Sequence, residues 1–149
     1  MKYEDGYPTP LPAYGTVTFI ANPSANDTLV VGGQTLTFKA SLSAAGDVLI
    51  GTAKEDTVQN IVAAWNGLTG AGTTYHASTP PLLLAEAAGT EATLYLTAFF
   101  PGKAGNSIGM SQSGTGVTGR YTLSASTLLH GFDGGKATYS YGRVGFAIN

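Results

Sequence analysis

The first third of the chain alternates between polar and apolar residues, and this pattern predicts β-strands. The alternation runs through residues 16–20 and continues in 28–31 and 34–39, on either side of Gly32-Gly33. A period of two places the apolar side chains on one face of a strand. A Gly-Gly pair between two such segments suits a two-residue turn in which both residues have positive φ. We therefore predict a β-hairpin around this pair, followed by a short strand at 47–50.

One segment, residues 52–66, has the periodicity of an amphipathic α-helix. Val58, Ile61, Val62 and Trp65 follow the i, i+3, i+4, i+7 spacing that forms a single apolar stripe. Trp65, the only tryptophan, is expected to anchor this helix in the core rather than to form a ligand platform.

The residues around this segment predict where the helix begins and ends. Thr52 and Glu55 have the spacing of a capping box, in which each side chain reaches the backbone of the other residue. Gly67 stands where a left-handed C-terminal cap is expected.

The second half of the chain returns to strand-like patterns. Residues 82–87 and 93–98 predict another hairpin, with its turn at 89–91, and further strands are expected at 107–111 and within 120–129. The predicted fold class is therefore mainly β (α+β), an antiparallel β-sandwich or barrel-like body with one helix.

Three regions are predicted from the order of these patterns: an extended N-terminal arm (residues 1–14), a β-rich body (15–135) and a C-terminal tail (136–149). The arm contains three alternating prolines, which favour an extended polyproline II conformation. It is either a frayed terminus or a segment that docks on another subunit through its tyrosines. The tail is either a closing strand of the body or a second docking segment that adds a strand to a neighbour.

Composition narrows the classes of function. The chain has 149 residues and a hydrophobic content of 43%, but only 11% of its residues are charged, against about 25% in typical soluble proteins. The net charge is −2 and the basic residues are not clustered, so neither nucleic acid nor an anionic membrane is an expected partner.

No apolar run is long enough to cross a bilayer, and the N-terminal residues 1–6 lack the apolar core of a secretory signal. The chain has no cysteine, which excludes a disulfide framework and is consistent with assembly in a reducing cytoplasm.

The sequence contains no recognisable catalytic or metal-binding constellation. His76 and His130 have no carboxylate at ligand spacing, so both are expected to be structural. Glu86 and Glu91 are expected to be solvated charges of a hairpin. We therefore expect a protein that is not an enzyme and that uses no cofactor or metal.

Several segments together resemble a small domain that is frequent in structural proteins of tailed bacteriophages. The resemblance extends over residues 15–135 and is carried by the hairpin 28–38, by the helix ending Ile61-Val62-Ala63-Ala64-Trp65-Asn66, by Leu94-Tyr95-Leu96-Thr97-Ala98, by Gly102-Lys103-Ala104-Gly105-Asn106-Ser107-Ile108 and by Gly131-Phe132-Asp133-Gly134-Gly135. The segment 102–108 is its most specific part. Trp65, the insertion around Thr79-Pro80-Pro81 and both terminal regions depart from the family pattern. Domains of this family occur as inserts in contractile-tail sheath proteins, in other tail components and as free-standing virion proteins.

The resemblance implies a virion structural protein that is assembled in the host cytoplasm. The expected function is that of a capsid decoration (cement) protein, a homo-oligomer that binds the major capsid protein or other virion proteins. The alternatives are a tail, neck or baseplate component and a carbohydrate-binding or host-adhesion module with exposed aromatic residues on the body. The candidate contact residues lie in the two terminal regions: Tyr3, Tyr7, Pro8, Pro10, Pro12, Tyr14, Tyr139, Tyr141, Arg143 and Phe146. Deleting residues 1–13 is expected to leave the body folded and to weaken incorporation into particles.

The few charged residues are unevenly distributed. No charged residue stands between Asp5 and Asp27. This interval covers most of the arm and the first predicted strand, and we expect a partner surface to fit there.

Overall fold

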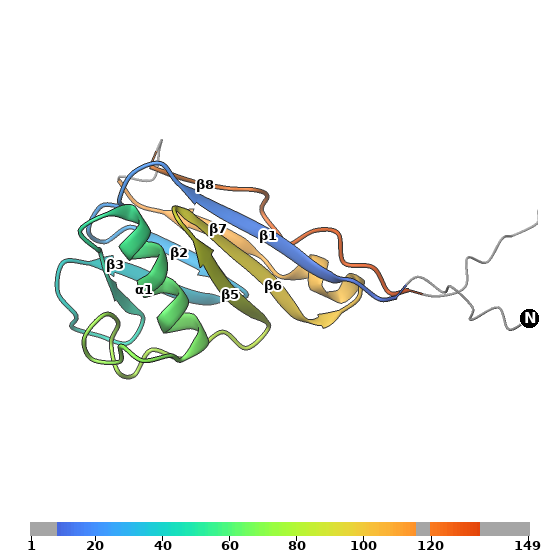
Figure 1. The fold of residues 1–149 in the computed structure, drawn as a ribbon, viewed down its shortest axis with the longest axis horizontal. Helices are drawn as coiled ribbons and strands as arrows, with labels where there is room; N and C mark the ends of the chain where they lie inside the picture. Colours follow the sequence, from blue (N-terminus) through green and yellow to red (C-terminus); the bar gives the residue numbers. More distant parts are fainter. Residues whose placement is uncertain (1–8, 116–119, 135–149) are drawn as a thin grey trace, which may run out of the picture.

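The computed structural model describes residues 9–115 and 120–134. This part of the chain forms two four-stranded sheets that lie face to face, with one α-helix beside them (Figure 1). The elements are β1 (Pro12–Phe19), β2 (Thr28–Val31), β3 (Gln34–Lys39), β4 (Asp47–Leu49), α1 (Lys54–Asn66), β5 (Ala85–Thr90), β6 (Thr93–Pro101), the 3-10 helix η1 (Lys103–Ser107), β7 (Met110–Ser113) and β8 (Tyr121–Leu123). The predicted fold class, a mainly β sandwich-like body with a single helix, is confirmed.

Each sheet combines strands from distant parts of the sequence. One sheet has the order β5-β6-β1-β8 and the other β4-β3-β2-β7. All neighbouring strands are antiparallel except β3 and β4, which are parallel. Because β1 and β2 belong to different sheets, residues 20–27 cross from one sheet to the other and do not form a hairpin turn.

The two open sides of the sandwich are closed in different ways. On one side α1 packs against β5 and β4. On the other side the backbone that follows β8 passes from one sheet to the other: the Ser124 N–H donates to Thr16 O at 2.8 Å, and Ser126 O accepts from the Met110 N–H at 2.8 Å. These hydrogen bonds give the body its barrel-like character on that side.

The predicted hairpin between β2 and β3 is confirmed. Gly32 and Gly33 form its two-residue turn, with φ values of 57° and 80°. Two consecutive positive φ values define the turn type whose twist matches that of paired strands. The hairpin of β5 and β6 also forms, but β5 begins at Ala85 instead of residue 82 and the turn lies at Glu91-Ala92, where Glu91 has a φ of 50°.

The helix begins one residue later than the capping box predicted. Ala53 is the N-cap residue, and its N–H donates to Asp56 Oδ2 at 3.0 Å, so Asp56 takes the part expected of Glu55. Thr52 therefore does not cap the helix. The C-terminal cap is as predicted, because Gly67 is left-handed with a φ of 62°.

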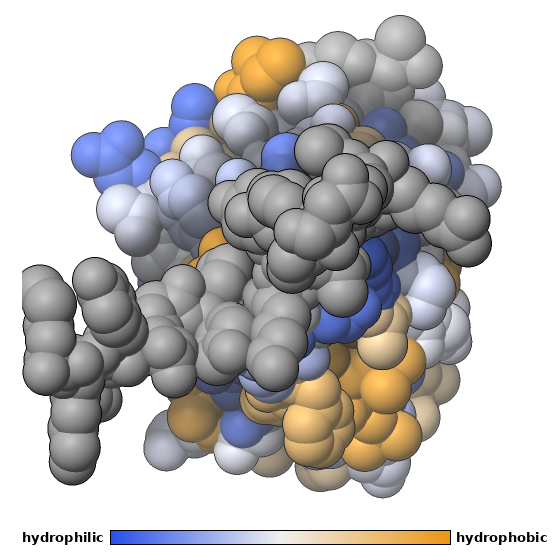
Figure 2. Space-filling model, turned by 90° about the vertical axis from the view of Figure 1, so that its right-hand side faces the viewer, coloured by the Kyte–Doolittle hydropathy of each residue, from blue (hydrophilic) through white to orange (hydrophobic). Residues whose placement is uncertain are grey.

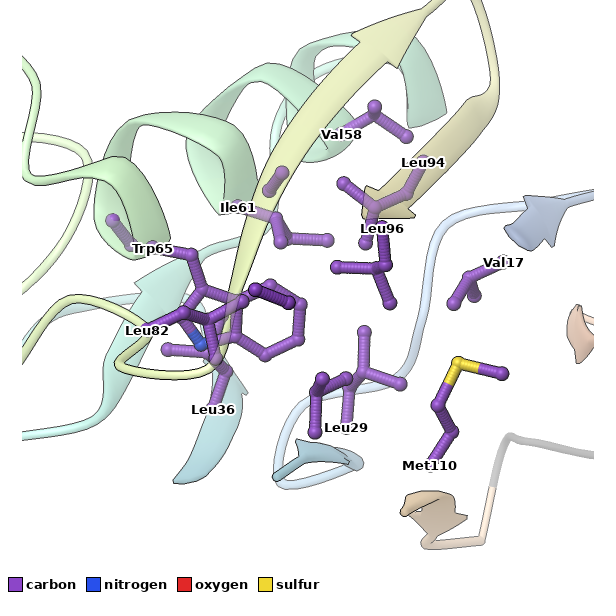
Figure 3. Close-up of a cluster of buried hydrophobic side chains, with 14 of the residues drawn as sticks. Val17, Leu29, Leu36, Val58, Ile61, Trp65, Leu82, Leu94, Leu96 and Met110 are labelled. Carbon is purple, nitrogen blue, oxygen red and sulfur yellow. The ribbon is translucent and has the colours of Figure 1, made fainter. Parts of the chain in front are cut away.

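The helix stripe and the inner faces of the sheets form one core (Figure 3). Val58, Ile61 and Trp65 are buried as predicted, whereas Val62 is only partly buried. The indole of Trp65 is 1% exposed and packs among aliphatic side chains from both sheets. Burial of this kind stabilises a fold by about 25 cal/mol for each Å² of apolar surface removed from water.

Some predicted boundaries differ from the structure. The body begins at Pro12 instead of residue 15, because the last residues of the predicted arm form the start of β1 and Ala13 is fully buried. The strand predicted at 107–111 is replaced by the end of η1 and by β7. The predicted tail, 136–149, lies outside the described residues.

Candidate functional site

The segment with the most specific sequence motif forms a 3-10 helix at one end of the sandwich. Gly102 precedes η1 with a φ of 118°, a conformation that side-chain-bearing residues rarely adopt. A 3-10 helix has three residues per turn, so residues three apart share a face. Lys103 and Asn106 therefore form one face of η1, and Ala104 and Ser107 form another.

Lys103 and Asn106, on one face of η1, form hydrogen bonds with Gly131 and Asp133, near the end of the described chain. The Asn106 side-chain amide accepts a hydrogen bond from the Gly131 N–H at 2.7 Å and donates one to Gly131 O at 3.1 Å. The Lys103 N–H donates to Asp133 Oδ1 at 2.6 Å, and Lys103 Nζ lies 4.0 Å from Asp133 Oδ2. We refer to Lys103, Asn106, Gly131 and Asp133 as the exit clasp.

A close approach of backbone to backbone explains the glycine in this clasp. A Cβ atom at residue 131 would lie 2.3 Å from Gly102 O and 3.1 Å from Ala13 Cβ. Neither atom belongs to a flexible side chain that could move aside. Only glycine therefore lets the C-terminal segment pack this closely on the body.

The clasped segment also pairs with the start of β1. Leu11 and Phe132 exchange two backbone hydrogen bonds of 2.8 and 2.9 Å, and Tyr14 and Leu129 exchange two of 2.9 Å. Between these pairs, His130 has a φ of 67° and stacks on the Tyr14 ring, with centroids 5.0 Å apart. The two ends of the described chain thus leave the body side by side (Figure 1).

Apolar side chains are exposed around this exit. The backbone bonds place Leu84 beside Phe99, Pro101 beside Pro12 and Leu11 beside Phe132, all at the same end of one sheet. Phe100 is 75% exposed and Leu83 72% exposed. Figure 2, which views the molecule from this side, shows a group of apolar residues gathered on this face. We refer to the exposed group as the apolar end: Leu11, Leu83, Leu84, Phe99, Phe100 and Phe132.

A small pocket opens within the apolar end. It has a volume of about 160 Å³ and is lined by Leu84, Ala98, Phe100, Ala104, Gly105, Ser107 and Ile108. The face of η1 formed by Ala104 and Ser107 therefore belongs to the pocket, while its neighbouring face belongs to the clasp. Apart from the Ser107 hydroxyl, which donates to Ala104 O at 2.7 Å, the lining side chains are apolar. A pocket with this lining suits an apolar group.

Only three of the sequence-predicted contact residues lie in the described part of the chain. Pro10 is exposed, Pro12 is half-buried opposite Pro101, and Tyr14 is 52% exposed against His130. The others lie outside the described residues: Tyr3, Tyr7, Pro8, Tyr139, Tyr141, Arg143 and Phe146. The structure therefore brings together residues 9–14 and 129–133, which adjoin the undescribed parts of the two predicted contact regions.

Sequence reasoning missed the apolar end. Its clearest signal is the pair Phe99-Phe100, since two adjacent aromatic residues in a strand cannot both face the core. Leu82-Leu83-Leu84 carries the same signal, because Leu82 alone of the three is buried. The charge-free interval from Asp5 to Asp27, in contrast, contains β1, which lies inside a sheet and exposes only its outer face.

The aromatic residues of the body differ in exposure, and this difference bears on the choice between an assembly protein and a carbohydrate-binding module. Trp65 is buried, as expected for an assembly protein. Tyr14 and Tyr95, however, are 52% and 45% exposed on the outer face of β1 and β6. They are diagonal neighbours, because Tyr14 pairs with Thr97 and Thr16 with Tyr95. Exposed aromatic rings on the body are what the carbohydrate-binding alternative predicts.

Within residues 9–115 and 120–134, no three His, Cys, Asp or Glu side chains are grouped so that they could hold a metal ion. The described residues include no helix with the length and apolar character needed to cross a membrane.

Comparison with known proteins identifies no matching family, and no curated protein is significantly similar to the chain.

Proposed function

We propose that this chain is a bacteriophage virion structural protein, and that it acts as a capsid decoration protein. The observation that carries the proposal is the exit clasp. Side-chain and backbone hydrogen bonds fix the starting points of both terminal segments at one end of a well-packed body, beside exposed apolar residues. This arrangement supports a protein that works by being bound to its neighbours.

The proposed mechanism is cementing. The folded body acts as a rigid spacer, and the segments that leave the clasp bind the major capsid protein or other virion proteins. When each subunit makes several such contacts on a repeated lattice, every additional contact raises the overall avidity. The subunits are proposed to form closed, symmetric homo-oligomers, as most soluble oligomers do.

The motif at 102–108 supports the choice of a virion protein. It is the most specific part of the resemblance to phage structural domains, and in this chain it forms η1 and half of the clasp. The same resemblance also includes tail proteins, so a tail, neck or baseplate location is the alternative within this class.

The test compares virus particles produced with and without the chain. We expect electron microscopy to show added density on the outside of the head, and the particles lacking the chain to release their DNA at a lower temperature. Density on the tail would establish the alternative location. Purified particles that contain none of the chain would contradict the proposal.

A second candidate function is favoured by the exposed Tyr14 and Tyr95 rings, which could stack on a sugar. Glycan-array binding that is lost in a Tyr95→Ala variant would support a host-adhesion module. A Tyr95→Phe variant is the matched control, because it keeps the ring.

A further inference from the structure

We propose that the pocket of the apolar end binds the Phe146 side chain of a second copy of this chain. The inference deepens the proposed function and rests on it: it names one contact through which neighbouring subunits hold each other. The occupant comes from residues 135–149, which follow the last clasped residues.

The size and lining of the pocket fit one aromatic ring. Its volume is about 160 Å³, close to the roughly 150 Å³ of an apolar cavity that is known to bind benzene. Buried Gly105 and Ile108 and exposed Phe100 contribute to its walls. Of the aromatic residues that follow Gly134, Phe146 is the one without a hydroxyl group. It therefore matches the apolar lining without leaving a buried polar atom unpaired.

The geometry of η1 favours a second copy over the chain's own tail. Lys103 and Asn106 hold the chain's own exit on one face of η1, and Ala104 and Ser107 line the pocket on the next face. In Figure 1 the described residues up to Gly134 extend beyond the end of the sandwich. Because the chain's own last described residues are held on the face of η1 next to the pocket, we assign the pocket to the tail of a second copy.

Length and charge are compatible with this contact. Residues 135–149 span up to about 50 Å when extended, enough to reach an adjacent subunit. They contain two basic residues, Lys136 and Arg143, and no acidic residue. The remaining 134 residues hold the other five Lys or Arg and all nine Asp or Glu, a net charge of −4. Tail and body therefore attract each other electrostatically.

Disulfide trapping tests the contact without background from native thiols, because the chain has no cysteine. A Ser107→Cys variant places a thiol at the pocket, and an Ala147→Cys variant places one beside an intact Phe146. When the two purified proteins are mixed and oxidised, we expect a disulfide-linked heterodimer on a non-reducing gel. A Thr90→Cys variant, exposed at the far end of β5, is the matched control and is expected to give little heterodimer with Ala147→Cys.

A further substitution shows whether the ring drives the contact. Phe146→Ala in the Ala147→Cys chain is expected to lower heterodimer formation about tenfold or more, since burying a Phe ring contributes strongly to association. Equal trapping with and without the ring would overturn the proposal. So would the absence of a heterodimer at millimolar protein, or an intramolecular disulfide as the only product of the Ser107→Cys/Ala147→Cys double variant.

The outcomes separate this inference from the proposed function. If trapping fails but the protein still binds particles, the pocket contact alone is wrong. If the heterodimer forms but the protein is absent from particles, the contact between copies stands and the virion function is wrong.

Discussion

The side-chain amide of Asn106 makes two hydrogen bonds with the backbone of Gly131, accepting from its N–H at 2.7 Å and donating to its carbonyl oxygen at 3.1 Å. This is the pairing that a neighbouring β-strand would provide. One side chain of a short 3-10 helix therefore takes the place of a strand and holds the C-terminal segment on the body.

Removing this amide is expected to loosen the clasp. Because each hydrogen bond has a net value of about 0.5–1.5 kcal/mol, an Asn106→Ala variant should lose about 1–3 kcal/mol of local stability. Hydrogen exchange of the Phe132 amide, which donates to Leu11 O, should accelerate by about tenfold or more. Ser107→Ala is the control, since its hydroxyl bonds only within η1. Equal exchange rates in the two variants would show that Asn106 does not hold this segment.

A methyl group at Gly131 is expected to disrupt the same contact sterically. The added Cβ would lie 2.3 Å from Gly102 O, so Gly131→Ala must displace backbone at a cost of about 1–3 kcal/mol. Gly109 provides a matched control, because a Cβ there meets nothing within 4 Å. Thermal unfolding should give a clearly lower Tm for Gly131→Ala than for Gly109→Ala. Similar Tm values would mean that the backbone approach is not tight in solution.

Two truncations test where the body begins. Deleting residues 1–8 removes none of the described contacts of the body, so this variant serves as the reference for the longer truncation. Deleting residues 1–13 removes the Leu11–Phe132 pair and fully buried Ala13, and urea unfolding should show a markedly lower midpoint. Equal midpoints would contradict a body that begins at Pro12 and would favour the predicted boundary at residue 15.

The single tryptophan reports directly on the core. Because the Trp65 indole is 1% exposed, its fluorescence should be blue-shifted and resistant to acrylamide in the native protein, and both properties should disappear on unfolding. An emission maximum typical of water-exposed indole would contradict the described packing. It would also favour the sugar-binding alternative, in which this ring takes part in stacking.

The carboxylate of Asp47 is expected to make stability depend on acid pH. Burial alone would raise the pKa of Asp47, but hydrogen bonds from the Ser43 and Ala44 N–H groups and the Ser43 hydroxyl, together with the charge of Lys39, hold this pKa below its usual value. A folded-state pKa below the unfolded one gives stability that is present above the unfolded value and is lost as the pH falls through the folded value.

An Asp47→Asn variant isolates this effect. It should be less stable than the parent at pH 7 by about 1–3 kcal/mol, because it loses a charged acceptor of three hydrogen bonds. The difference should shrink below about pH 4, where the carboxylate of the unfolded parent begins to take up a proton, and should vanish once the folded carboxylate is protonated as well. Urea unfolding at several pH values measures both quantities. A difference between the two proteins that is constant from pH 7 to pH 3 would contradict this role for the charge.

Local features of the fold could be predicted because a few neighbouring residues determine them. The Gly32-Gly33 turn depends on two positive φ values, and α1 depends on a stripe of apolar residues that ends at Gly67. The shift of the N-cap from Thr52 to Ala53 shows the limit of this approach. Glu55 follows Thr52 at the same spacing as Asp56 follows Ala53, so the local pattern fits both starting points, and the structure uses Ala53 and Asp56.

Features that combine distant segments could not be predicted from local patterns. The parallel pairing of β3 with β4 and the separation of β1 from β2 depend on how the two sheets pack. The candidate site likewise depends on residues that are far apart in the sequence. Its motif at 102–108 was visible in the sequence, but the partner of Asn106 stands 25 positions further along the chain. Alternating prolines also suggested that β1 began later, although Pro12 fits into it opposite Pro101.

The shared exit of the two chain ends determines where foreign sequence can be added to this protein. A tag or enzyme fused to either terminus extends a segment that joins the body beside the clasp, and it is expected to compete for the surface that neighbouring subunits are proposed to use. The turn at Glu91-Ala92 lies at the other end of β6, about 30 Å away for a strand of nine residues. A peptide inserted between these two residues is expected to be displayed on the opposite end of the body, away from the proposed assembly contacts.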